Sequence, residues 1–274
     1  MHRRDVVRLL ASALPAAAWW RASARTTPLA PIGLELYTVR SLMERDVEGT
    51  LAAVAGIGVR EVEFAGYFDR RPDALRHTLQ SLGLAAPSAH VSYESALADW
   101  SRVLGDANAV GHHWVVIPSI DAQYRRTLRD WHNVCDRLTR AAEQARAAGL
   151  AFAYHNHDVE FQPLEGRLPY DVLLASTDPA LVQCQLDLYW IRKGGQDPLA
   201  YFRRWPGRFP MVHVKDMAAD GRMADVGAGV IDWPAIFAHR AEAGIQHYYI
   251  EHDEPADPLA SVRASYHYLS RLDV

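Results

Sequence analysis

The sequence predicts a closed barrel of eight parallel strands, each followed by a helix, in a single domain. Three observations lead to this fold class. Short apolar runs recur eight times along the chain, a segment with helical character follows each run, and glycine or proline residues separate the units. Strands that alternate with helices of this length form parallel sheets, and eight such units favour closure into a barrel. The 274 residues suit one such domain, since these barrels run to about 250 residues.

The eight expected strands are short apolar runs that stop at a polar or turn-forming residue. They lie at residues 32–39, 59–64, 84–91, 114–117, 150–154, 181–188, 209–214 and 247–250. Gly58 precedes the second run, Gly83 the third and Gly149 the fifth, and Pro118 closes the fourth. Glycine and proline at these positions indicate turns at the ends of buried strands.

The expected helices follow the strands in register. They lie at residues 46–55, 72–82, 95–110, 128–148, 169–176, 198–204, 233–243 and 258–272, with a glycine-rich loop at 225–231 before the seventh. An open doubly wound sheet is the alternative fold. It would usually carry a glycine-rich phosphate turn after its first strand, and here LELYTVRS contains no glycine.

Composition limits the class of protein. Hydrophobic residues make up 49% and charged residues 23%, as in ordinary soluble domains, and the net charge of -4 offers no basic surface for nucleic acid or anionic lipid. Cys135 falls in a helical pattern and Cys184 in a strand, so we expect buried thiols and no disulfide scaffold. No segment after the N-terminus has the 18 or so apolar residues of a membrane span.

Residues 1–24 have the features of an export signal. Arg3 and Arg4 precede a modest apolar stretch, and Ala22-Ser23-Ala24 is a small-residue cleavage site, so the twin-arginine route to the periplasm is expected. An amphipathic helix that belongs to the fold is the alternative. On the export reading, residues 25–31 form a linker and residues 32–274 form the barrel.

Polar side chains stand where the last four apolar runs stop. They are His155, Asp187, His213 and Glu251. Because the carboxyl ends of barrel strands converge on one face, these four side chains should meet there. Two imidazoles and two carboxylates suit one divalent ion such as Mn, Co, Fe, Ni or Zn better than Ca or Mg. A polar loop whose histidines cap neighbouring backbone groups is the alternative for the fifth strand end.

Several motifs resemble one known superfamily. They are IGLELYTVR, VREVEFAGY, SAHVSYE, YHNHDVEF, QLDLYWI, MVHVKDM, VGAGVIDW and YYIEHDEP. The chain is similar over nearly its whole length after the expected signal to the xylose-isomerase-like sugar phosphate isomerase/epimerase superfamily. These metal-dependent TIM barrels also include tagatose/psicose epimerases, inosose dehydratase and endonuclease IV.

The resemblance implies a ligand set and exposes one departure from it. Epimerase-type members hold their metal with Glu, Asp, His and Glu from strands five to eight, and Asp187, His213 and Glu251 match in type. His155 occupies the place of the first Glu, with Glu160 or His157 as substitutes. In the epimerases the two glutamates exchange protons on opposite faces of the sugar, so a histidine at this place puts two-faced exchange in question.

Other positions carry expected roles through the same resemblance. Glu63, His90, Tyr37, Trp190 and Asn156 are candidate substrate-binding residues. Lys215 would stabilise an enolate oxygen, and Asp216 would orient His213 or Lys215. For His112 and His113, at the start of the fourth strand, a structural role is favoured.

The implied chemistry is proton abstraction next to a carbonyl, with Glu251 as base, His157 as second group and Lys215 as electrostatic support. From the sequence we expect a divalent-metal-dependent isomerase or epimerase of an unphosphorylated sugar. A lyase that eliminates the aglycone of a 3-keto-glycoside is the alternative, and a non-catalytic sugar-binding barrel ranks below it. The expected partner is a small carbohydrate, not nucleic acid.

Overall fold

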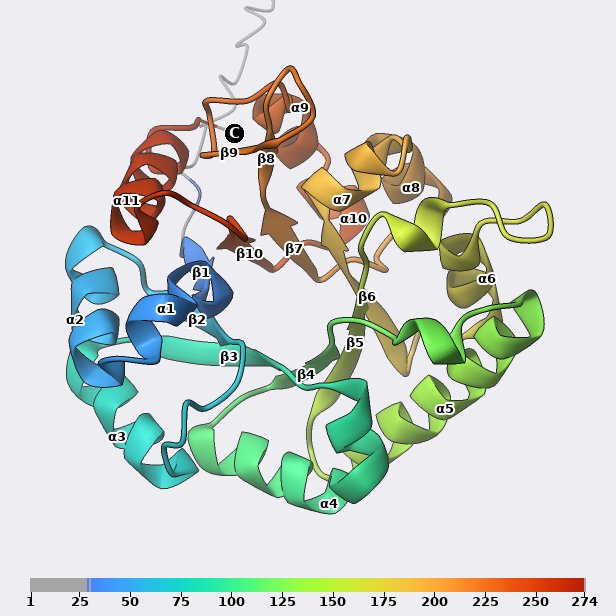
Figure 1. Cartoon of the computed structure of the whole chain (residues 1–274), viewed down its shortest axis with the longest axis horizontal. Helices are drawn as coiled ribbons and strands as arrows, with labels where there is room; N and C mark the ends of the chain where they lie inside the picture. The colour runs from blue at the N-terminus through green and yellow to red at the C-terminus, as the bar shows by residue number, and fades with distance from the viewer. Residues whose placement is uncertain (1–28, 30, 274) are drawn as a thin grey trace, which may run out of the picture.

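The computed structural model describes residue 29 and residues 31–273, and these residues form a closed eight-stranded barrel (Figure 1). Its strands are β1 (Gly33–Glu35), β2 (Glu61–Phe64), β3 (Ala85–His90), β4 (Trp114–Ile117), β5 (Ala151–His155), β6 (Val182–Asp187), β7 (Met211–Val214) and β10 (His247–Ile250). All neighbouring pairs are parallel, in the closed order β1-β10-β7-β6-β5-β4-β3-β2. The predicted fold class is confirmed.

Helices surround the barrel, as Figure 1 shows. They are α1 (Arg40–Met43), α2 (Val47–Ile57), α3 (Pro72–Leu82), α4 (Tyr93–Val110), α5 (Leu128–Ala147), α6 (Pro169–Ser176), α7 (Leu188–Lys193), α8 (Pro198–Arg204), α9 (Trp233–Ala238), α10 (Arg240–Ala243) and α11 (Pro258–Leu269). The longest, α5, begins with a capping box between Thr127 and Asp130 and buries the face that carries Trp131 and Leu138. Such caps satisfy backbone N–H groups that have no partner inside the helix.

Side-chain alternation along the strands places the site residues. The barrel interior holds a small apolar cluster of Val116, Ala153, Met211 and Tyr249. On β5, Tyr154 points outward and packs edge-on against Trp131 of α5. Successive strand residues face opposite sides, so His155, two positions after Ala153, points into the barrel. The polar end of β5 therefore lies directly above the apolar interior.

The structure differs from the expected elements in four places. The first strand stops at Glu35, whose carboxylate accepts the Tyr37 N–H and starts a 3-10 turn, Leu36–Val39. Helix α7 follows β6 directly, because Asp187 accepts the N–H groups of Tyr189 and Trp190 as an N-cap. The helix expected at 233–243 is divided into α9 and α10 at His239. A short ribbon, β8 (Asp216–Met217) and β9 (Met223–Ala224), precedes the glycine-rich loop.

Asp216 does not have the expected role beside His213 or Lys215. Its carboxylate accepts the N–H groups of Gly227, Gly229 and Ile231 and the indole N–H of Trp233. Asp216 therefore organises the glycine-rich loop. A side chain at Gly229 would collide with this carboxylate, because an added Cβ would overlap Asp216 Oδ1.

The predicted export signal, residues 1–24, lies outside the described residues, as does most of the linker at 25–31. Among the described helices, none is both long and apolar enough to cross a membrane. Export and the proposed start of the domain stay predictions.

Candidate active site

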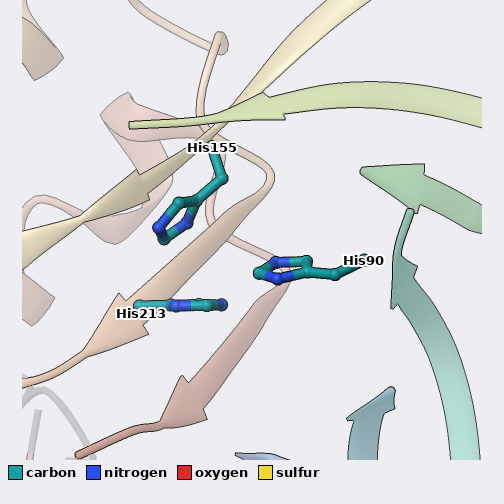
Figure 2. A group of neighbouring side chains, drawn as sticks. All are labelled: His90, His155 and His213. Carbon is teal, nitrogen blue, oxygen red and sulfur yellow. The ribbon is translucent and has the colours of Figure 1, made fainter. Parts of the chain in front are cut away.

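Three imidazoles face one another at the carboxyl ends of alternate strands. Figure 2 shows His90, His155 and His213 directed toward a common space from β3, β5 and β7. Their ring centroids lie 4.5 to 5.3 Å apart, and one nitrogen from each lies within 4.8 Å of the others. The barrel thus brings together His90 and His213, which lie 123 positions apart in the sequence.

The four predicted metal ligands converge on His213. Asp187, His213 and Glu251 each offer one ligand atom within 4.8 Å of the others. His155 belongs to the three-imidazole group, and its Nε2 lies 4.0 Å from Asp187 Oδ2. Glu160, the substitute ligand, lies on the other side of the strand, where it accepts the Tyr154 hydroxyl and the His157 N–H. His155 is therefore the β5 side chain that faces the group.

A buried lysine joins the carboxylates of this site. Lys215 Nζ lies 2.7 Å from Glu251 Oε2, 2.8 Å from Asp253 Oδ1 and 3.0 Å from Asp187 Oδ2. Burial opposes the charge on Lys215, but the carboxylates of Asp187 and Glu251 raise its pKa above the ordinary value. Although burial alone would raise the pKa of Glu251, the charges of Lys215 and His213 hold it well below its usual range. Both groups are ionised at neutral pH.

His213 stands between two carboxylates. Its Nδ1 lies 2.6 Å from Glu251 Oε2 and its Nε2 lies 2.7 Å from Glu63 Oε2. Burial would lower the pKa of His213, yet these two carboxylates raise it to about 10. In this arrangement the ring is an imidazolium that donates from both nitrogens.

The residues present fit a divalent cation. Four buried carboxyl groups, those of Glu35, Glu63, Asp187 and Glu251, lie within this part of the barrel. Burial first, and then neighbouring carboxylates, raise the pKa of Glu35 well above its ordinary value, and burial raises the pKa of Asp187 to about 6. Crowded buried carboxyl groups retain protons unless a positive charge offsets them. Without a metal, Lys215 and the protonated His213 supply two positive charges. To act as a ligand, His213 would have to lose one ring proton, and a divalent ion would then replace that charge and supply one more.

The surroundings of Asp187 Oδ2 support this fit. This buried oxygen has the Lys215 ammonium 3.0 Å away and accepts no assigned hydrogen bond from the described residues. His155 Nε2 faces it at 4.0 Å, and burial lowers the pKa of His155 well below its usual value, so the ring is neutral. Mixed imidazole and carboxylate ligands suit Mn, Co, Fe, Ni or Zn.

Gln185 is a site residue that the sequence analysis did not select. Its Nε2 donates to both oxygens of Glu63, and its Oε1 lies 2.8 Å from His90 Nε2 and 3.1 Å from His155 Nδ1. Burial opposes ionisation of Glu63, but His90 and His213 lower its pKa to about 2, so Glu63 only accepts. Because Glu63 can only accept, the NH2 group of Gln185 must face Glu63. Gln185 Oε1 then faces His90 and His155, and both rings must donate to it. With its proton on Nδ1, the neutral His155 ring has its lone pair on Nε2, which faces Asp187.

We expect Gln185→Leu to weaken metal binding about 10- to 100-fold, since an apolar side chain no longer holds the His155 tautomer. Nitrogen NMR of the imidazoles should show loss of the Nδ1–H form of His155, which a purely structural role would not alter. Gln183→Leu, on the same strand with its amide bonded to Pro179 O, is the matched control. Equal metal affinity in wild type and Gln185→Leu contradicts the assignment.

A cavity of about 340 Å³ opens above the site. Its lining includes Tyr37, His90, His155, His157, Lys215, Glu251 and Asp253. Tyr37 and His90 therefore lie where substrate contact was predicted. The ring of His157 makes no hydrogen bond to any described residue, and burial together with Lys215 lowers its pKa to about 4. It is a neutral imidazole on the cavity wall.

Two predicted substrate-binding residues do not reach this cavity. Glu63 is fully buried below it, bonded to Ser88, Gln185 and His213. Asn156 is also fully buried, and its Oδ1 accepts the Asp187 N–H and so joins the ends of β5 and β6. Their expected contact with substrate is corrected to the positioning of neighbouring side chains. The strand ends were visible in the sequence, but the depth of each side chain was not.

His112 has the structural role that was favoured. It is buried, and its Nδ1 lies 2.6 Å from the Ala86 carbonyl oxygen. The ring also stacks on Tyr67. His113 contributes its backbone N–H to the Pro87 carbonyl, which continues the pairing of β3 with β4.

The chain matches a family model described as xylose isomerase-like TIM barrel over residues 36–272. It is 26% identical to an inosose dehydratase of Geobacillus kaustophilus over 266 residues, with 81% of this chain and 86% of the relative covered. A sugar phosphate isomerase/epimerase structure from Parabacteroides distasonis superposes with a TM-score of 0.78 at 26% identity, covering 88% of this chain and 98% of the other. The structure of an IOLI protein with a bound zinc atom has the same fold, with a TM-score of 0.68 at 14% identity over 86% and 95% of the two chains.

Proposed function

Because the chain belongs to the xylose isomerase-like TIM barrel family, we propose that it is a divalent-metal-dependent lyase acting on a polyhydroxylated keto ring. The proposed reaction removes a proton next to the ketone and expels an oxygen substituent from the following carbon. The similarity to an inosose dehydratase supports this branch. It reverses the order expected from the sequence, where isomerisation or epimerisation ranked first.

One observation carries the proposal: the carboxylates that line the cavity lie on one side of it. Glu251 and Asp253 both follow β10. In the closed strand order β4 lies opposite β10, and its neighbours β3 and β5 supply His90 and His155. A carboxylate on one face serves elimination, in which one group can take the proton and return it to the leaving oxygen. Epimerisation needs proton exchange on two faces.

Glu251 is the proposed base. Its Oε2 contacts His213 and Lys215, whereas Oε1 accepts no hydrogen bond from the described residues. The carbon-bound proton passes to Glu251, and the C–H electron pair forms the new double bond. The leaving oxygen departs with the C–O electron pair and takes the proton from Glu251. Lys215, which also lines the cavity, stabilises the negative charge on the enolate oxygen.

We propose that His155, Asp187, His213 and Glu251 hold the metal. When bound, a divalent ion supplies Lewis-acid stabilisation of the charge that develops on the ketone oxygen. Asn156 accepts the backbone N–H of Asp187 and so fixes the end of β6, and Gln185 holds the ring of His155. Tyr37, an exposed aromatic residue at the rim, would contact the ring.

Epimerisation is the second candidate, and His157 favours it. This neutral imidazole lies on the cavity wall and is free to exchange a proton opposite Glu251. The Parabacteroides distasonis structure, named an isomerase/epimerase, agrees with this branch. The expected export signal favours an unphosphorylated substrate for either reaction.

Turnover in heavy water distinguishes elimination from epimerisation. The metal-loaded enzyme is incubated with a keto-inositol, a 3-keto-glycoside and free ketoses, and NMR follows products and deuterium. We expect an enone and a released leaving group from the first two substrates and no turnover of free ketoses. Fast epimerisation of free ketoses with deuterium at the epimerised carbon, and no elimination product, would show that the lyase proposal is wrong. Loss of that activity in His157→Ala would then identify the second acid/base group.

A further inference from the structure

A second and larger cleft opens beside the cavity. Its volume is about 1060 Å³, compared with about 340 Å³ for the cavity above the metal ligands. Its walls come from α7, the β8–β9 ribbon and the segment after β10, which lie side by side at one edge of the barrel mouth (Figure 1). Asp253 lines both spaces. The two spaces therefore adjoin at this residue.

Trp190 lies at the boundary between the cleft and the cavity. It lines the cleft, and its ring centroid lies 5.3 Å from that of His157, which lines the cavity. Lys215 Nζ lies 5.5 Å from the same indole ring. A substrate ring held near Lys215 and Glu251 would thus have one edge next to the cleft. A substituent on that edge would extend into the larger space.

One part of the cleft wall carries aromatic rings and thioethers, and the rest carries charged side chains such as Arg192, Lys193 and Glu254. Tyr189 and Trp190 form an edge-to-face pair with centroids 4.9 Å apart. Met217 and Met223 are direct cross-strand partners on the ribbon, and both are partly exposed in the same cleft. Aromatic rings and methionine sulfur make favourable contacts with another aromatic ring. The aromatic and thioether part of the wall suits a flat apolar group.

Several polar side chains at the cleft are paired within the protein, whereas Trp190 Nε1 has no partner among the described residues. Arg222 pairs with Asp220 at 2.8 Å, and the Tyr189 hydroxyl donates to the Gly221 carbonyl. His252 Nδ1 accepts the Glu254 N–H. A second sugar needs several directed hydrogen bonds, whereas an aromatic ring needs area. The part of the wall formed by Trp190, Met217 and Met223 therefore fits an aromatic group.

We propose that this cleft is a leaving-group subsite that binds an aromatic aglycone, so that the substrate is a keto-glycoside of a phenol. The inference rests on the proposed lyase function and adds its substrate class. It also agrees with the one-sided placement of the carboxylates. A phenol has a pKa near 10, so its oxygen leaves as a phenolate with little help from an acid on a second face.

The test compares two substrates that differ in the aglycone. They are the 3-keto derivatives of p-nitrophenyl β-glucoside and methyl β-glucoside. We expect wild type to have a KM about tenfold lower for the aromatic substrate. Met223→Glu places a charge in the wall and should raise that KM about tenfold, with methyl glycoside turnover unchanged as evidence of a folded site. Leu97→Glu, an equally drastic change on an exposed residue outside the cleft, should alter neither.

Equal KM values for the two substrates in wild type, or equal losses for both in Met223→Glu, would overturn the subsite. A binding measurement separates this outcome from failure of the lyase function. If wild type turns over neither keto-glycoside, the keto-glycoside substrate class is wrong. Turnover of the keto-inositol then tests the lyase function separately, and calorimetry with p-nitrophenol still decides whether the cleft binds an aromatic ring. Binding to wild type that is lost in Met223→Glu supports an aromatic site. Absence of binding, or binding unchanged by Met223→Glu, refutes it.

Discussion

We expect Asp187→Asn to lose the proposed divalent ion and to keep a folded barrel. The substitution removes the anionic oxygen that lies 4.0 Å from His155 Nε2 within the ligand group. It keeps a side-chain oxygen that can accept the N–H groups of Tyr189 and Trp190, so the start of α7 is preserved. Lys215 retains Glu251 and Asp253 as partners, so no buried charge is left alone.

We expect metal affinity to fall at least about 100-fold and turnover to fall with it. Elemental analysis after chelation and reloading measures the metal, and circular dichroism with thermal unfolding measures the fold. Asp171→Asn is the matched control, because Asp171 bonds Tyr201 and Arg204 away from the ligand group. Full metal occupancy in both Asp187→Asn and His213→Ala would refute the ligand set.

Glu251→Gln should lower turnover about 100- to 10,000-fold, the range in which a positioned acid/base group contributes. The amide keeps the shape of the side chain but cannot take the carbon-bound proton. It also removes one anionic partner from Lys215 and from His213. Single-turnover kinetics at saturating metal would separate loss of the base from weaker metal binding, since the metal content is measured in the same samples.

Asp253→Asn is the control for this assignment. Asp253 also lines the cavity and lies 2.8 Å from Lys215 Nζ, so it shares the surroundings of Glu251. We expect a loss of less than about tenfold, because Glu251 still holds Lys215 and takes the proton. A large loss in Asp253→Asn with near-normal turnover in Glu251→Gln would transfer the role of base to Asp253.

The sequence was sufficient to predict the barrel and the clustering of the proposed ligands at its mouth. The strand expected at 114–117 and the helices at 72–82, 169–176 and 198–204 agree with β4, α3, α6 and α8 residue for residue. Apolar periodicity and turn residues are local signals, which is why they can be read without tertiary structure. The convergence of His155, Asp187, His213 and Glu251 follows from topology alone, because all strands of such a barrel end on one face.

Tertiary structure decided how deep each side chain lies and what it contacts. Glu63 pairs in register with Ser88, below the mouth, so it supports Gln185 and His213 and does not reach the cavity. The register between strands sets this depth, and no local pattern encodes it. The contacts of Asp216 with the glycine-rich loop and the cleft beside Trp190 depend on how long loops pack at the barrel mouth. Those packing contacts join distant parts of the chain, and only the folded barrel brings them together.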